Sequence, residues 1–286
     1  MKYAMIRRHE GKHATALMCR LLSVSRGGYY DWRDRPTPPR TEADKDLGQA
    51  IRRIYDDHKG RIGSPRITWA LRNEGRRVGK NRVARLMRQK ALRAKAARKY
   101  KATTHSEHNW PVAPNLLNQD FSAQRPNQKW VADITYLATD EGWLYLAVVL
   151  DLYARKVVGW AMSERMTAKL TCDALRMALW RRKRPQGVIV HSDRGSQYCA
   201  HDTRRLLKTH GLIASMSKKG DCYDNAAMES GNHSLKVEAI HGKRLSARQE
   251  ARNPVFEYIE IHYNRKRLHS GLGYLSPEAF EQRHVD

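Results

Sequence analysis

The chain is 286 residues long, enough for one sizeable core and one or two small modules. Its 54 Lys and Arg residues against 29 Asp and Glu residues give a net charge of +25, which favours a polyanionic partner, above all nucleic acid. The apolar run Leu144–Leu150 is too short to span a membrane and the four cysteines form no CxxC pair, which argues against a zinc ribbon or disulfide framework and predicts a soluble, cytoplasmic protein.

The first predicted element is a short helical unit over residues 1–40. Leu17 and Leu21 recur at helical spacing, and residues 24–28, which end in two glycines, predict a turn before a second helical stretch. This pattern resembles a helix-turn-helix, although a helical hairpin that contacts no DNA fits it as well. The prolines within residues 36–39 cannot continue a helix, so we expect a stiff spacer there.

A strongly basic helical module is predicted over residues 44–101. Leu47, Ile51 and Ile54 fall on one helical stripe, and two similar stripes follow. Residues 60–101 hold 15 basic residues and one acid, Glu74, which is too one-sided for salt bridges along a solvated helix face. We expect contact with the DNA backbone; a merely solvated basic surface is the alternative. The DNA-contacting residues predicted in this module are Arg66, Lys80, Asn81, Arg82, Arg85 and Arg88.

Residues 102–125 are predicted to form a linker, and residues 126–286 the largest domain. Runs rich in β-branched and aromatic residues predict strands over 130–137, 143–150 and 156–162. Helical spacing over 167–182, a short apolar run over 187–191 and helical spacing over 201–210 come next. This order is typical of an α/β, RNase H-like catalytic core, here preceded by small all-helical modules.

Two acids lie in or just after predicted buried strands, which are positions that indicate a functional role. Asp133 lies inside the first strand, where an ionised carboxylate is costly unless it is paired or binds a metal. Asp193 stands three residues after the apolar run Val188–Val190, at the end of a strand that should open towards a crevice. Asp151, at the end of the second strand, is the acid for which we expect a structural role. His191 and His233 are expected to be structural or to face DNA instead of binding metal, and Cys199 and Cys222 to be small buried residues.

A third acid, Glu229, stands in the first turns of a helix predicted after the polar segment 221–225. Asn225, His233 and Lys236 lie four before, four after and seven after it, so all share its face. Such a polar stripe suits DNA better than a core. Three carboxylates on rigid elements are the oxygen ligands that two Mg²⁺ ions, or Mn²⁺ as a substitute, require for phosphoryl transfer between DNA strands.

Several characteristic stretches stand in this chain: NQKWVADITYL, HSDRGSQY, DNAAMES followed by LKVE, and HYNRKRLHSGLGYLSPEAF, together with GSPRI and VGKNRVARLMR nearer the start. In these stretches the chain resembles the transposases of the IS3 family of bacterial insertion sequences, specifically their second-frame product. Asp193 and Glu229 are separated by 35 residues, 194–228, the spacing that this family shares with retroviral integrases.

The resemblance implies a catalytic and metal-binding triad of Asp133, Asp193 and Glu229, with Lys236 contacting donor DNA. Asn225 and, in the last motif, Arg267 are further expected DNA contacts. The resemblance also implies that the substrate is double-stranded DNA, at the element's ends and at the target. It further implies that one strand is nicked and that the 3′-hydroxyl so formed attacks DNA. A homo-oligomer on nucleoid DNA is expected, because two ends must be held together, and a first-frame product, fused or associated, as a further partner.

Two positions depart from the family pattern. Gly231 stands where an aromatic residue usually follows the glutamate, and Ile62 stands where a tyrosine precedes GSPRI. Neither is a metal ligand. A phage or retroviral type of integrase is a poorer fit, because His105 and His108 have no partner cysteines for a zinc module. A DNA-binding regulator with an inactive core is the alternative from another class, and the three retained acids count against it.

Overall fold

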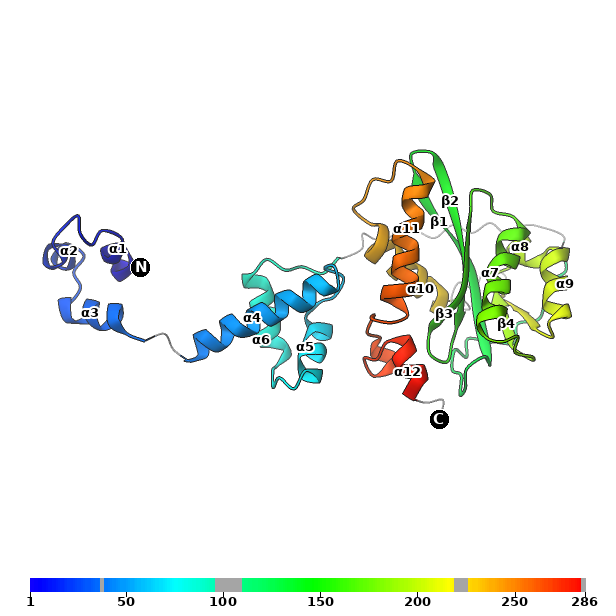
Figure 1. The fold of residues 1–286 in the computed structure, drawn as a ribbon, viewed down its shortest axis with the longest axis horizontal. Helices are drawn as coiled ribbons and strands as arrows, with labels where there is room; N and C mark the ends of the chain where they lie inside the picture. Colours follow the sequence, from blue (N-terminus) through cyan, green and yellow to red (C-terminus); the bar gives the residue numbers. More distant parts are fainter. Residues whose placement is uncertain (37–38, 96–109, 219–225, 284–286) are drawn as a thin grey trace.

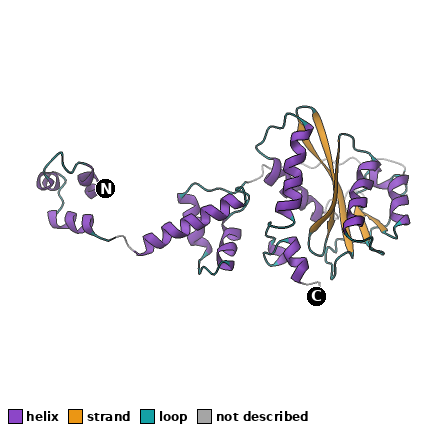
Figure 2. Ribbon diagram, viewed as in Figure 1, coloured by secondary structure: helices purple, strands orange, loops and turns teal. Residues whose placement is uncertain are grey.

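The computed structural model describes residues 1–36, 39–95, 110–218 and 226–283 (Figure 1). Helices dominate the first 95 residues, and the strands of the described residues lie between Lys129 and Met216 (Figure 2). Among the described residues, no helix combines the length and apolar character that crossing a bilayer requires. The α/β class with helical modules in front is therefore confirmed.

The N-terminal unit consists of α1 (Lys2–Arg8), α2 (Thr15–Leu21) and α3 (Arg26–Asp34) around a small core of Ile6, Cys19 and Tyr29. The turn between α2 and α3 ends earlier than predicted, because the Ser25 hydroxyl accepts a hydrogen bond from the Gly28 amide at 2.9 Å and starts α3 at once. The two glycines therefore lie inside the helix. A Cβ on Gly28 would come within 2.6 Å of the Tyr3 hydroxyl, so a larger residue there would make the end of that side chain move.

The basic module is a three-helix unit formed by α4 (Pro39–Asp57), α5 (Ser64–Asn73) and α6 (Lys80–Gln89). The predicted apolar stripes converge on one core. Ile62, the departure from the family's tyrosine, is completely buried in this core. Lys80 and Asn81 at the start of α6, and Arg88 near its end, remain exposed.

The largest domain is built on a five-stranded sheet in the order β3-β2-β1-β4-β5. The antiparallel meander joins β1 (Lys129–Thr139), β2 (Gly142–Asp151) and β3 (Lys156–Ser163), as predicted. β4 (Ile189–Ser192) pairs with β1 in parallel, and β5 (Ile213–Met216) pairs in parallel with β4.

Helices cover both faces of this sheet (Figure 1). One face packs against α7 (Ala168–Arg181), α8 (Ser196–Cys199) and α9 (His201–Thr209). On the other face, α10 (Ala226–Leu235) runs on into the π-helical turns η2 (Lys236–Ile240), and α11 (Arg248–Phe256) into η3 (Glu257–Tyr263). The chain then forms η4 (Ser270–Leu272) and α12 (Pro277–Arg283).

The described end of the predicted linker is held against the domain. Leu117 is 1% exposed within the core on the α10 side of the sheet. The backbone amide of Met216, on the edge strand β5, donates to the Pro114 carbonyl at 3.3 Å. Residues 114–117 therefore close one edge of the sheet instead of passing it freely.

Candidate active site

Asp133 lies in the middle of β1, on the sheet face that α10 covers. Side chains alternate along a strand, and the neighbouring odd position, Val131, belongs to the core between the sheet and α10. The amide of Asn232, on α10, donates to the Asp133 carboxylate at 2.7 Å. The pKa of Asp133 is raised to about 7, first by burial and then by the negative charge of Asp193, with a further contribution from Glu229.

Asp193 follows β4 and stands beside Asp133. The parallel register pairs Val131 with His191, and two residues further on it brings position 133 level with position 193. The Asp193 carboxylate accepts a hydrogen bond from the Gly195 amide at 2.9 Å, which folds the chain back at the end of the strand. A Cβ on Gly195 would come within 2.9 Å of that carboxylate oxygen, so glycine keeps this turn tight.

Glu229 lies in the first turn of α10 and is exposed. Its charge contributes the smallest of the effects that raise the pKa of Asp133. Within the part of the chain that the structure describes, no three acidic, His or Cys side chains converge tightly enough to enclose a metal ion. The structure thus brings Asp133 and Asp193 together as a close pair, with Glu229 at the outer side.

Asn232 is a site residue that the sequence reasoning missed. It is three positions after Glu229, so it lies on the neighbouring part of the same helix face, and this spacing was the available signal. The Lys236 ammonium lies 4.5 Å from the centre of the Tyr136 ring. Burial lowers the pKa of Lys236, while Tyr136 and Asp133 favour its charged form. Lys236 therefore stands beside the acids, as the predicted face requires.

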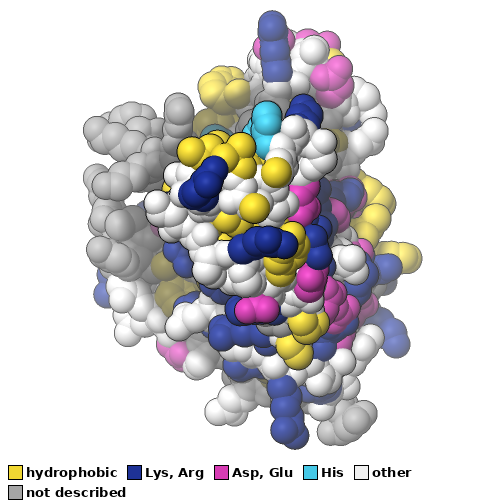
Figure 3. Space-filling view, turned by 90° about the vertical axis from the view of Figure 1, so that its left-hand side faces the viewer, with side chains coloured by type: hydrophobic (Ala, Val, Ile, Leu, Met, Phe, Trp, Pro, Cys, Tyr) yellow, Lys and Arg dark blue, Asp and Glu magenta, His cyan; other side chains and the backbone are white. Residues whose placement is uncertain are grey.

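The predicted DNA contacts differ in what they face. Lys80, Asn81 and Arg88 are exposed on α6. Arg82 and Arg85 are partly buried and both form ion pairs with Asp44, at 2.7 and 2.6 Å. Figure 3 views the molecule from its N-terminal side and shows Lys and Arg side chains scattered among hydrophobic and acidic ones.

Arg66 and Arg267 face into the protein. Arg267 is 7% exposed, and its guanidinium donates to the Glu238 carboxylate at 2.9 Å and to the Ser234 hydroxyl at 2.9 Å. Arg66 lies 3.7 Å from the same carboxylate. Both side chains are engaged within the protein instead of being presented to DNA. Asn225, like Cys222, falls outside the described residues.

The acid expected to be structural has that role. Asp151 is fully buried, accepts hydrogen bonds from the Asn127 and Tyr153 amides at 2.9 and 3.1 Å, and pairs with Arg182 at 3.2 Å. His191 is also buried, with Ser215 and Ser217 hydroxyls 2.9 and 3.2 Å from its two ring nitrogens. Cys199 is fully buried.

Gly231 faces the apolar layer behind the site. It lines a small pocket with Tyr258 and Ile259 of η3, and a Cβ built on it would meet nothing within 4 Å. We expect Gly231→Ala to raise the free energy of unfolding by about 0.5–1 kcal/mol, because alanine removes the entropic cost of glycine in a helix. Thermal or urea unfolding of the purified protein measures this; a loss of stability would mean that the position is more crowded than the structure shows.

Both the basic helical module and the largest domain match known domain families. Residues 123–222 and 229–285 match integrase core domain families, and residues 42–100 match an HTH-like domain family. Among solved structures, a chain of the simian T-cell lymphotropic virus intasome in complex with PP2A regulatory subunit B56 gamma aligns at 14% identity and a TM-score of 0.47, over 81% of this chain and 74% of that one. The magnesium complex of the HTLV-2 integrase catalytic core aligns at 14% identity and a TM-score of 0.42, over 55% and 97%.

Curated relatives match along the whole length. The transposase InsF for insertion sequence IS3A of Escherichia coli (strain K12) is 52% identical over 287 aligned residues, which cover 100% of both chains. A 31 kDa protein of insertion element IS600 from Shigella sonnei is 49% identical over 93% of this chain and 98% of its own. With an integrase core behind an HTH-like domain and this full-length identity, the chain belongs to the IS3 family of insertion-sequence transposases.

Proposed function

We propose that this transposase catalyses metal-dependent DNA strand cleavage and strand transfer at the ends of its insertion sequence, with Asp133, Asp193 and Glu229 as the catalytic acids. The observation that carries the proposal is the Asp133 carboxyl. Burial and two neighbouring acids raise its pKa to about 7, and its carboxylate is hydrogen-bonded by two neutral groups, the Asn232 side-chain amide and the Ile134 backbone. Added positive charge at this site would stabilise the ionised form of the Asp133 carboxyl.

The donor set fits a hard divalent cation. Asp133, Asp193 and Glu229 offer only carboxylate oxygens, the ligands that Mg²⁺ prefers and Mn²⁺ accepts. A cation between them would stabilise the ionised form of Asp133, which the protein alone disfavours. When bound, two such ions activate the attacking oxygen and stabilise the leaving oxygen of a phosphoryl transfer. Glu229, exposed at the start of α10, would complete the ligand set by turning towards the pair.

The surrounding residues have supporting roles in this proposal. Asn232 orients the Asp133 carboxylate through its 2.7 Å hydrogen bond. Lys236, held over Tyr136, offers a positive charge to a DNA phosphate next to the acids. The basic module supplies the DNA affinity through its exposed cations. Because two element ends must meet, we further propose that the active form is a homo-oligomer assembled on DNA, with a first-frame product fused or associated.

A nicking assay tests the proposed function. Purified protein is incubated with labelled duplexes carrying the ends of its own element, in Mg²⁺, in Mn²⁺ and in EDTA. We expect a cut with a free 3′-hydroxyl at the element end, and its joining to a second strand, in the two metals only. Specific binding to the same duplex without any cut in either metal would instead support the DNA-binding regulator.

Exposed cations on α6 give a second test. The double variant Lys80→Ala, Arg88→Ala should weaken DNA binding by about tenfold near 0.1 M salt and reduce the salt slope by about 2, because each lost phosphate contact releases one counterion fewer. The control Lys45→Ala, Arg52→Ala removes the same charge from exposed ion pairs of α4 with Glu42 and Asp56. Equal weakening in both variants would mean that overall charge, and not α6, binds the DNA.

A further inference from the structure

The helix that carries Glu229 ends against the basic module. α10 continues without a break into η2, since Leu235 keeps helical angles, so Glu229 lies in its first turn and Glu238 in its last. The last carbonyls of a helix have no partner within the helix and need one from outside. The Glu238 carbonyl accepts from the Arg61 guanidinium at 3.1 Å and from the Lys95 ammonium at 3.5 Å, and both donors belong to the basic module.

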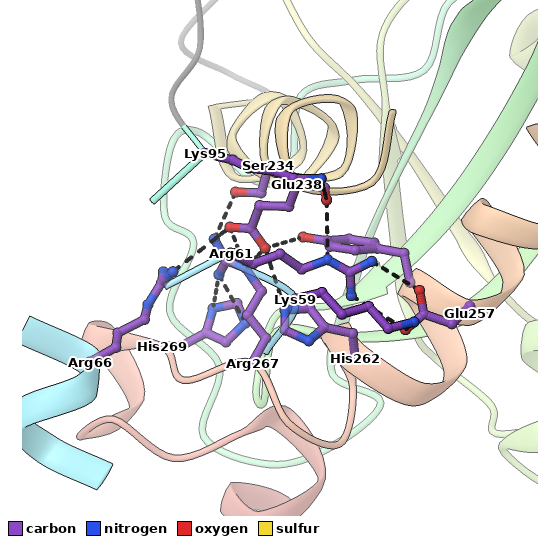
Figure 4. A network of polar contacts seen from close by, with 11 residues as sticks. Lys59, Arg61, Arg66, Lys95, Ser234, Glu238, Glu257, His262, Arg267 and His269 are labelled. Atoms are coloured by element: carbon purple, nitrogen blue, oxygen red, sulfur yellow. Dashed lines mark hydrogen bonds and ion pairs between the residues drawn. The ribbon is translucent and has the colours of Figure 1, made fainter. Parts of the chain in front are cut away.

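Arg61 is built into this interface. It is 5% exposed, and its guanidinium also grips the Glu257 carboxylate with two hydrogen bonds of 3.3 and 2.9 Å. Glu257 begins η3, the helix that packs beside α10, and the Arg61 guanidinium lies 5.4 Å from the centre of the Tyr258 ring. One side chain of the module thus joins the end of the catalytic helix to the start of its neighbour (Figure 4).

The Glu238 side chain completes the contact from the core side. It accepts from Arg267 at 2.9 Å and from the Tyr258 hydroxyl at 2.9 Å, and it lies 3.7 Å from Arg66 of the module. Figure 4 shows the Glu238 carboxylate at the centre of these groups. Hydrogen bonds from His262, Arg267 and Tyr258, together with the charge of Arg267, lower the pKa of Glu238 to about 2, against the effect of its burial. Glu238 is therefore ionised, and its position is fixed from several sides.

Further contacts lie around this centre. The Lys266 ammonium pairs with Asp57 at 3.0 Å, and the Trp69 ring stacks on that of Tyr274 with the ring centres 6.4 Å apart. Each pair joins α4 or α5 to the C-terminal segment of the core. The module is accordingly docked along a surface, and a cation at the negative end of a helix is favourable in its own right.

We propose that Arg61 is a positioning residue: it caps the last turn of the helix that carries Glu229 and fixes the basic module, with the DNA held there, against the catalytic core. This rests on the proposed function for its catalytic consequence. It assigns Arg61, Arg66 and Arg267 to coupling between DNA binding and the active site. DNA bound along α6 would then reach the acids at one distance and angle, which is what productive phosphoryl transfer needs.

Hydrogen exchange tests the coupling without any activity. In the full-length protein, free of metal and DNA, Arg61→Met should accelerate exchange of the amides of residues 236–241 by about tenfold, because the uncapped turn opens locally, while the β1 and β2 amides keep their wild-type rates. The control is Lys59→Met, which removes an exposed partner of the same Glu257, 3.2 Å away, but no helix contact. Wild-type exchange in Arg61→Met, or equal acceleration in Lys59→Met, would overturn the proposal.

A second arm measures function. Arg61→Met should slow single-turnover cleavage by about tenfold or more at saturating DNA, with DNA affinity within about twofold of wild type, since the module itself is unchanged. If the wild-type protein cuts no DNA, the proposed function fails and the exchange result still decides the coupling. If Arg61→Met does not fold, Glu257→Gln decides: about threefold faster exchange at 236–241 is expected from the weakened anchor, and an unchanged rate would contradict it.

Discussion

Asp133→Asn, Asp193→Asn and Glu229→Gln are each expected to reduce DNA cleavage and joining to below about one per cent of wild type, because each removes an anionic ligand without changing the shape of the side chain. DNA affinity should stay within about twofold, since the exposed cations of the basic module are untouched. Single-turnover cleavage and a binding titration on the same duplex measure the two quantities.

Asp151→Asn is the matched control for these amide variants. It removes a buried charge from the neighbouring strand, where Asp151 holds two backbone amides and Arg182. It should lower the melting temperature, because Arg182 loses one of its two buried carboxylate partners and keeps only Glu281, yet leave cleavage per folded molecule near wild type. Cleavage retained by any one of the three triad variants would remove that acid from the active site. Cleavage lost equally in Asp151→Asn would mean that the loss in the triad variants does not identify the catalytic acids.

The largest expected effect on stability is at Gly159. This glycine lies on β3 opposite Val149, where α7 crosses the sheet. A Cβ there would overlap the Ala174 carbonyl and come within 2.7 Å of the Ala178 amide nitrogen, and both are backbone atoms of a packed helix. We expect Gly159→Ala to lower the free energy of unfolding by about 3 kcal/mol, because neither the strand nor the helix can give way cheaply.

Gly231→Ala is the natural control for this substitution, because the added methyl group is the same and the site is open. Urea unfolding of both variants should show opposite shifts of the midpoint. A Gly159→Ala protein as stable as wild type would mean that α7 sits further from β3 than the structure places it.

Most of the core could be predicted because its signals are local. The runs 130–137, 143–150 and 156–162 are long and β-branched, and each became a strand with ends shifted by at most two residues. β5 was not predicted, because it spans only four residues, Ile213–Met216. Their burial does not alternate along the strand, so no two-residue period marks them as a strand. It is a strand because β4 offers it hydrogen bonds, which a local pattern cannot reveal.

The site was predictable where motif and periodicity agree, and less so where contacts are distant. Asp133 and Asp193 follow from strand positions, and the parallel pairing of β1 with β4 brings them together. Asn232 was within reach of a three-residue spacing from Glu229. The contact of Arg61 with Glu238 joins residues 177 positions apart, and in sequence Arg61 looks like any other cation of a basic segment. Which distant residues pair depends on tertiary packing, and the composition of a segment does not reveal it.

Metal binding by the acids tests the central claim most directly. Calorimetric titration of Mn²⁺ into the protein bound to element-end DNA should give two ions per chain, with affinity falling about tenfold per pH unit below pH 7, because the metal must displace a proton from Asp133, whose pKa is raised to about 7. Asp133→Asn should lose this binding. Two ions bound by Asp133→Asn with unchanged affinity and no dependence on pH would contradict a metal site built on these three carboxylates.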